Sequence, residues 1–157
     1  MASNLPDDSG ALPSGSAAPV PLSASEERTW AMLAHLSVLL NLVTGFLGVF
    51  APLFVYLIYQ KRSRYVAVQS MQAFVFQLIW WGGGGVLIGL MWAIVGALSA
   101  IIVGVVLIPF ACVLTPLFLL MPLVALVYGV IGAIQCGEGK DFRYWLVGDC
   151  VNKLQQP

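Results

Sequence analysis

Two long stretches of this chain carry no charged side chain. Residues 29–60 and residues 65–137 contain no Asp, Glu, Lys or Arg. A helix that crosses the hydrocarbon core of a bilayer needs about 20 mostly apolar residues, and both stretches exceed that length. The pattern therefore predicts an all-α fold, a polytopic membrane helical bundle, rather than a soluble domain.

The first uncharged stretch predicts a helical hairpin. A single helix over residues 29–60 would be about 48 Å long, against a hydrocarbon core of about 30 Å. Asn41, Thr44 and Gly45 lie near its middle and are typical of a turn. We therefore predict two helices, over about 25–42 and 46–61.

The second uncharged stretch is long enough for two helices of about 30 residues or for three shorter ones. Two helices, over about 65–97 and 104–136, keep every Lys and Arg on one side of the membrane. Three helices would move Lys140 and Arg143 to the other side, and this alternative stays open. We predict two, which makes four transmembrane helices arranged as two hairpins within residues 25–147. The positive-inside rule then places the basic side and both termini in the cytoplasm, in the inner membrane of a bacterium.

The two ends of the chain differ from this body. Residues 1–24 are rich in Pro, Ser, Gly and Ala, and we expect a disordered tail because they bury too little apolar surface. Ser23 followed three residues later by Glu26 has the spacing of a capping box, which predicts that the first helix begins there. Residues 138–157 carry charges again and are predicted to be a short cytoplasmic C-terminal segment.

Composition strengthens the membrane assignment. Hydrophobic residues make up 60% of the chain and charged residues only 9%, whereas soluble domains carry roughly 25% charged residues. The formal net charge is zero, so no overall field attracts nucleic acid. We expect the lipid bilayer and other membrane proteins as partners. A basic collar, Lys61, Arg62 and Arg64, suits anionic lipid headgroups.

Small residues recur every four positions in two parts of the second stretch. The two stripes are Gly85, Gly89, Ala93 and Ala97, and Ala125, Gly129, Ala133 and Gly137. In lipid, small side chains let helices approach closely and so supply packing energy. We predict that the two stripes are helix-packing faces that meet each other.

Polar side chains interrupt the apolar stretches at a few positions: His35, Asn41, Gln69, Gln72 and Gln77. At 100° per residue, the three glutamines fall within about 140° of one helix face. Two interpretations stay open for this polar seam. We favour hydrogen bonds between helices, worth about 0.6–2 kcal/mol per contact. The alternative is a lining for a pore or a water-filled vestibule.

The residues that catalysis needs are scarce. His35 is the single histidine, which excludes a bis-histidine haem site but leaves a proton relay or one bound metal or pigment open. No acid lies within the two uncharged stretches, and the three cysteines form no C-x-x-C motif. We expect no enzyme, no catalytic residue, no metal site and no cofactor.

Four segments carry a resemblance to known proteins. They are ERTWAMLAHLS (27–37), APLFVYLIYQKRS (51–63), QAFVFQ (72–77) and IGAIQCGEGKDFRY (131–144). Together they resemble a widespread family of small bacterial membrane proteins with a domain of unknown function. That family is distantly similar to the chloroplast inner-envelope protein-import channel.

The resemblance spans about residues 26–147 and implies a helical bundle. The family landmarks would fall here on His35, Gln72, Ala73, Gln77, Gly137, Glu138, Arg143 and Tyr144. Val75 and Trp145 stand where relatives usually have Asn and Pro. Without the Asn the seam has one polar group fewer, which weakens its interpretation as the lining of a pore. The family's function is unassigned, so the resemblance implies a fold rather than an activity.

These observations favour a non-enzymatic integral membrane protein. We expect an accessory or assembly subunit of a larger membrane complex, or a homo-oligomer, because packing faces are present and catalytic groups are not. The alternative is a small channel or a protein-translocation component, suggested by the polar seam and by the resemblance.

Overall fold

The computed structural model describes residues 19–154, and this part of the chain is helical with no strand. The all-α prediction is confirmed for these residues. Most of the expected tail, residues 1–18, lies outside the described part. The elements in chain order are α1 (Ala24–Leu36), η1 (Ser37–Leu39), α2 (Leu40–Thr44), η2 (Leu47–Val49), α3 (Phe50–Tyr59), α4 (Arg64–Gln77), η3 (Leu78–Gly82), α5 (Gly83–Ser99), α6 (Val103–Gly137) and α7 (Gly148–Leu154).

The first hairpin has two short rods. Elements α1, η1 and α2 follow one another without a break, and η2 with α3 forms the return. At α1 the predicted capping box is confirmed: Ser23 Oγ accepts from the Glu26 amide, and Glu26 Oε2 accepts from the Ser23 amide. The chain reverses at Gly45, whose φ of +75° is a conformation that glycine adopts without a Cβ penalty.

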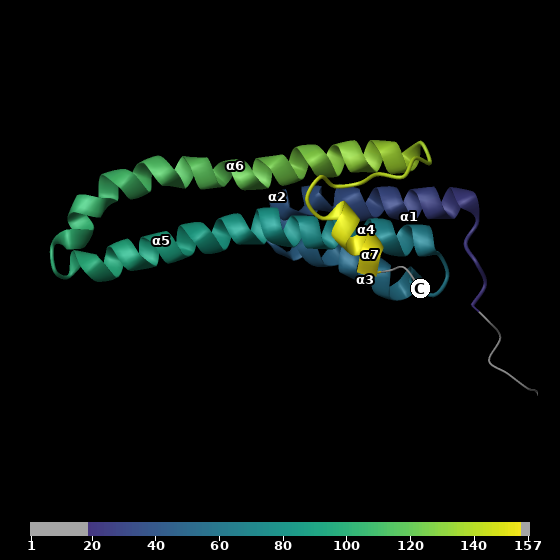
Figure 1. The fold of residues 1–157 in the computed structure, drawn as a ribbon, viewed down its shortest axis with the longest axis horizontal. Helices are drawn as coiled ribbons and strands as arrows, with labels where there is room; N and C mark the ends of the chain where they lie inside the picture. The colour runs from purple at the N-terminus through teal and green to yellow at the C-terminus, as the bar shows by residue number, and fades with distance from the viewer. Residues whose placement is uncertain (1–18, 155–157) are drawn as a thin grey trace, which may run out of the picture.

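The second hairpin is much longer (Figure 1). Elements α4, η3 and α5 make one rod of 36 residues, and α6 has 35 residues. At about 1.5 Å per residue these rods are roughly 54 and 52 Å long. Both are long and apolar enough to cross a membrane, and they are the two described helices that meet this test. The turn between them is residues 100–102.

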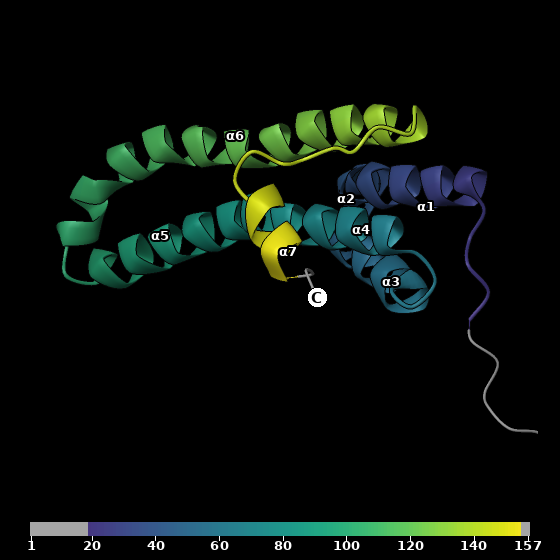
Figure 2. The same ribbon diagram turned by 45° about the vertical axis from the view of Figure 1, so that its right-hand side comes forward.

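The first hairpin covers only part of the second (Figures 1 and 2). Its tip lies at the level of η3, a π-helical turn, because Trp81 Nε1 donates to the Gly45 carbonyl. A Cβ on Gly82 would lie 3.0 Å from the ring of Phe46. We call residues 83–122, where only α5 and α6 lie side by side, the overhang. The rest of the two hairpins, where four rods lie side by side, is the base.

Contacts of α6 with α1 hold the base together. A Cβ on Gly129 would lie 2.6 Å from Val38 Cγ1, and one on Gly137 would lie 3.3 Å from Met32 Sδ. Ala125 and Ala133 on the same stripe are buried. The small residues of α6 therefore pack against α1.

The prediction that the two small-residue stripes meet each other is wrong. Gly85, Gly89, Ala93 and Ala97 are exposed, and nothing lies within 4 Å of a Cβ built on Gly85 or Gly89. The physical reason is the level of each stripe in an antiparallel pair. The first stripe lies in the overhang and the second in the base, so they cannot face each other. Instead, Gly84 approaches Met121 and Pro122, and Gly104 approaches Ser99.

Candidate functional site

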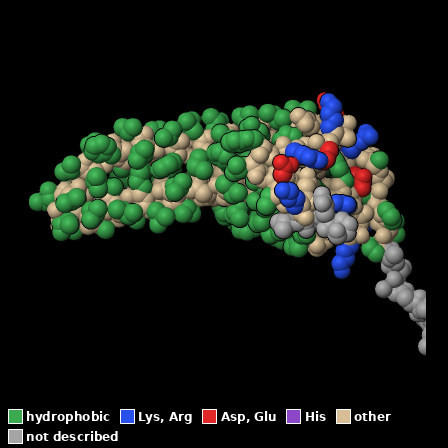
Figure 3. All heavy atoms as spheres, viewed as in Figure 1, with side chains coloured by type: hydrophobic (Ala, Val, Ile, Leu, Met, Phe, Trp, Pro, Cys, Tyr) green, Lys and Arg blue, Asp and Glu red, His purple; other side chains and the backbone are tan. Residues whose placement is uncertain are grey.

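Charge is concentrated at the outer end of the base (Figure 3). Its charged side chains come from the first turns of α1, the connection between the hairpins, the start of α4, residues 138–147 and α7. They are Glu26, Glu27, Arg28, Lys61, Arg62, Arg64, Glu138, Lys140, Asp141, Arg143, Asp149 and Lys153. We call the part that carries these charged residues the charged end. In the same view the overhang presents hydrophobic side chains.

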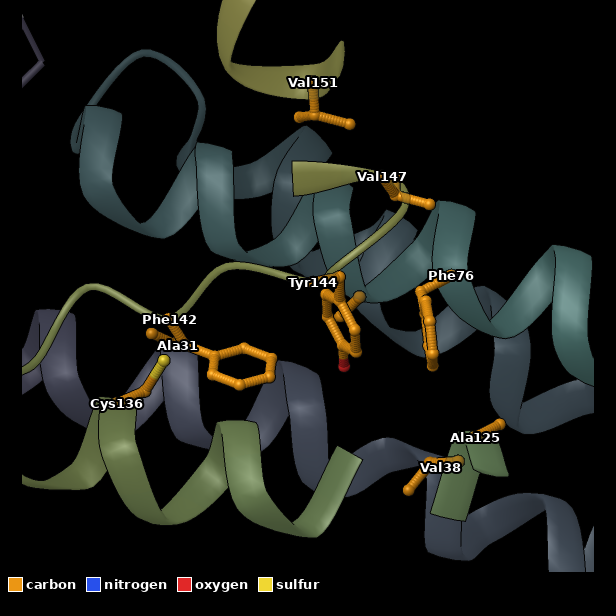
Figure 4. Close-up of a cluster of buried hydrophobic side chains, with 10 residues drawn as sticks. Ala31, Val38, Phe76, Ala125, Cys136, Phe142, Tyr144, Val147 and Val151 are labelled. Atoms are coloured by element: carbon orange, nitrogen blue, oxygen red, sulfur yellow. The ribbon is translucent and has the colours of Figure 1, made fainter. Parts of the chain in front are cut away.

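The C-terminal segment, residues 138–147, runs back along the base and inserts side chains into it. Phe142 and Tyr144 point inward, whereas Arg143 and Trp145 are exposed. Helix α7 then lies on α4 and buries Val151. Figure 4 shows these inward side chains beside Phe76 and Cys136.

Tyr144 is the centre of this core. Its ring stacks on Phe76 with centroids 4.0 Å apart and meets Phe142 edge-on at 4.8 Å. Its hydroxyl lies 2.8 Å from His35 Nδ1. Burial raises the pKa of the Tyr144 hydroxyl, which keeps its proton and donates to the imidazole.

Gln69 connects three parts of the base. Its Nε2 donates to Asp141 Oδ1 at 2.6 Å and to the Phe142 carbonyl at 3.1 Å. Its Oε1 lies 3.0 Å from His35 Nε2 and accepts the imidazole hydrogen. The result is a chain of hydrogen bonds from Tyr144 through His35 and Gln69 to Asp141, which ties α1 and α4 to the C-terminal segment.

A second set of hydrogen bonds lies nearer the tip of the first hairpin. Gln77 Nε2 donates to Ser37 Oγ, and Gln77 Oε1 accepts from Asn41 Nδ2, both at 3.2 Å. Gln72 Oε1 accepts from the Tyr144 amide at 3.4 Å. Gln72 Nε2 is buried and has no partner among the described residues.

The structure brings all the polar-seam residues into the base. None of them is more than 1% exposed. His35 with Gln69 and Asn41 with Gln77 form hydrogen bonds between helices, the kind of contact that the favoured interpretation predicts. Gln72 instead accepts from the backbone of the C-terminal segment.

Sequence reasoning missed the inward side chains of the C-terminal segment. Residues 138–157 were expected to be a short cytoplasmic segment, yet Phe142 and Val147 are core residues. The alternation of aromatic and polar residues in DFRYW was the available signal. Cys136 is also buried, with its Sγ 3.5 Å from Gln69 Oε1. Within residues 19–154, no three His, Cys, Asp or Glu side chains group closely enough to hold a metal ion.

The fold and the confinement of charge to one end define an all-helical membrane protein. A family model described as the magnetosome magnetite crystal formation protein family matches residues 26–151, and the chain belongs to this family. The match supports the expected bacterial membrane-protein family, whereas the expected likeness to the chloroplast channel does not emerge from it. Searches of curated proteins and of solved structures gave no match.

Proposed function

We propose that this protein is a non-enzymatic accessory protein of a magnetosome membrane and contributes to the formation of magnetite crystals. The observation that carries the proposal is the family match over residues 26–151, which runs from the first turn of α1 into α7. It thus includes the base, the overhang and the C-terminal segment. The protein acts through partners in the membrane rather than through catalysis.

The C-terminal segment indicates where the membrane begins. Gly148 lies against α4, since a Cβ there would be 3.2 Å from Gln72 Oε1. Arg143 and Asp149 beside it are exposed, with side-chain exposures of 61% and 84%. Exposed charges are costly in hydrocarbon. The hydrocarbon core therefore begins beyond Gln72, toward the overhang.

The length of the remaining rod fits one bilayer. Residues 78–99 span about 33 Å, close to the hydrocarbon thickness of about 30 Å. Trp80 and Trp81 lie at the base side of this span, where aromatic anchors occur. We infer two full crossings in place of four, one by η3 with α5 and one by α6. The first hairpin enters the membrane part of the way with its apolar tip, and the charged end faces the cytoplasm.

Two native cysteines test this placement. Cys150 on α7 and Cys112 in the overhang are both exposed and free. A membrane-impermeant maleimide is expected to label Cys150 in inside-out vesicles and to leave Cys112 unmodified, because a thiol in hydrocarbon does not ionise. The measurement is the mass shift of single-cysteine variants, with detergent-denatured protein as the control for full reactivity. Labelling of Cys112 from either face, or of Cys150 only in right-side-out vesicles, would contradict the placement.

The distribution of polar groups favours partners at the charged end. The tip of the overhang presents Ile101, Ile102 and Val103, which are exposed and apolar. Every charged side chain of the described residues lies at the opposite end. Electrostatic complementarity with another protein is therefore available only there.

The role in crystal formation is tested by deletion and complementation in a magnetite-forming bacterium. Loss of the gene is expected to shift the crystal-size distribution measured by electron microscopy, and the wild-type gene is expected to restore it. Mild-detergent purification of the complementing protein is expected to recover a stoichiometric membrane partner. An unchanged size distribution in the deletion strain would overturn the proposal.

A further inference from the structure

A pocket of about 550 Å³ opens at the charged end, between α4, the C-terminal segment and α7. Its lining mixes cations with groups that accept hydrogen bonds. The cations are Arg64, Arg143 and Lys153, and the acceptors include Asp141, Asp149 and Asn152.

The acids of the pocket leave two cations without a partner. The Asp141 carboxylate has a partner in Gln69, whose Nε2 donates to its Oδ1. Asp149 Oδ1 lies 3.8 Å from Arg143 Nη1. Among the described residues, neither Arg64 nor Lys153 lies within ion-pair distance of a carboxylate. Three cations against two carboxylates leave one formal positive charge, which suits a monoanion.

The position of the pocket along the molecule matches the level of lipid headgroups. Tyr65 and Val68, on the first turns of α4, complete the lining. The C-terminal segment next to it exposes Trp145 and Leu146, by 76% and 56%. An exposed tryptophan beside charged residues is typical of a membrane interface, where its ring lies at headgroup level. The phosphates of the adjoining leaflet then lie at the level of the unpaired cations.

We propose that this pocket binds the phosphate of an anionic phospholipid whose headgroup carries hydroxyls, such as phosphatidylglycerol. Arg64 and Lys153 hold the phosphate through charge-assisted hydrogen bonds. Asp149 and Asn152 accept hydrogen bonds from the headgroup hydroxyls, which explains why acceptors stand among the cations. The inference rests on the membrane placement above and is independent of the role in crystal formation.

The test compares two double variants that remove the same charge. Arg64→Gln with Lys153→Gln empties the pocket of its unpaired cations. Lys61→Gln with Lys140→Gln removes two lysines elsewhere at the charged end. Native mass spectrometry of the full chain, with equal amounts of phosphatidylglycerol and phosphatidylcholine added, measures the fraction of protein that retains one lipid. Because the pocket cations contact the phosphate directly, retained phosphatidylglycerol is expected to fall about tenfold in the pocket variant and less than about threefold in the control.

A second arm separates the two sources of phosphate. Excess inorganic phosphate is expected to leave the retained phosphatidylglycerol unchanged. Displacement by inorganic phosphate would replace the lipid with a soluble phosphate ligand and overturn the lipid assignment. An equal loss of retained phosphatidylglycerol in both double variants would overturn the assignment of the pocket as the lipid site. Equal retention of the two lipids by the wild type would overturn it as well. Thermal unfolding of each variant in detergent checks that the base is intact, because all four side chains are at the surface.

Discussion

Replacing Tyr144 by alanine is expected to lower the free energy of unfolding by about 3–5 kcal/mol, the usual range for loss of a large buried aromatic side chain. Tyr144 is 2% exposed, and its ring packs between Phe76 and Phe142. Its removal leaves a cavity at the centre of the base. It also leaves His35 Nδ1 without its hydrogen-bond partner, which adds to the cost. Denaturant unfolding of the detergent-solubilised protein measures the change.

The neighbouring residue is a matched control. Trp145 is 76% exposed, so Trp145→Ala is expected to change the unfolding free energy by less than about 0.5 kcal/mol. Tyr144→Phe keeps the packing and removes the hydroxyl, and is expected to cost about 1 kcal/mol. If Tyr144→Ala proved as stable as wild type, the C-terminal segment would not be docked on the base in the native protein.

A leucine at Gly129 is expected to destabilise the protein by about 1–3 kcal/mol or more, because the side chain has no space between α6 and α1. Even a Cβ would lie 2.6 Å from Val38 Cγ1 and 3.2 Å from the His35 carbonyl. The two helices must therefore separate at this level. The same unfolding measurement, with the yield of monodisperse protein on size exclusion, reports the loss.

Gly89→Leu is the matched control on the other stripe. Nothing lies within 4 Å of a Cβ on Gly89, and glycine costs a helix about 1 kcal/mol relative to alanine. This variant is expected to be as stable as the wild type or slightly more stable. A loss equal to that of Gly129→Leu would mean that another protein covers the first stripe in the native assembly.

Charge and hydropathy along the chain predicted the helical architecture because those signals are local. The uncharged stretches contain most of the helical residues up to Gly137, and the capping box at Ser23 marks the start of α1. The hairpin turn at Gly45 was visible for the same reason, since a glycine among Asn and Thr favours a turn.

Contacts between distant parts of the chain were harder to predict. Spacing alone identified two small-residue stripes, but their distances from the turn at residues 100–102 place them at different levels. Counting residues from that turn would have excluded their pairing. The glutamines were recognised as a shared face, yet Gln69 and Gln72 find partners in a segment whose charges made it look like a solvated end. A charged segment can still dock when alternate side chains are aromatic, as in Phe142 and Tyr144.

The docking of the C-terminal segment has a consequence for biosynthesis. His35 and Tyr144 are 109 positions apart in the chain, and Gln69 and Phe142 are 73 apart. During translation, both hairpins are therefore complete before the last polar groups of the base find their partners. A chain that ends before Asp141 lacks the partners of His35 Nδ1 and of the Gln69 amide nitrogen. The hydrogen-bond network of the base is therefore complete only after this last segment has been made and has docked.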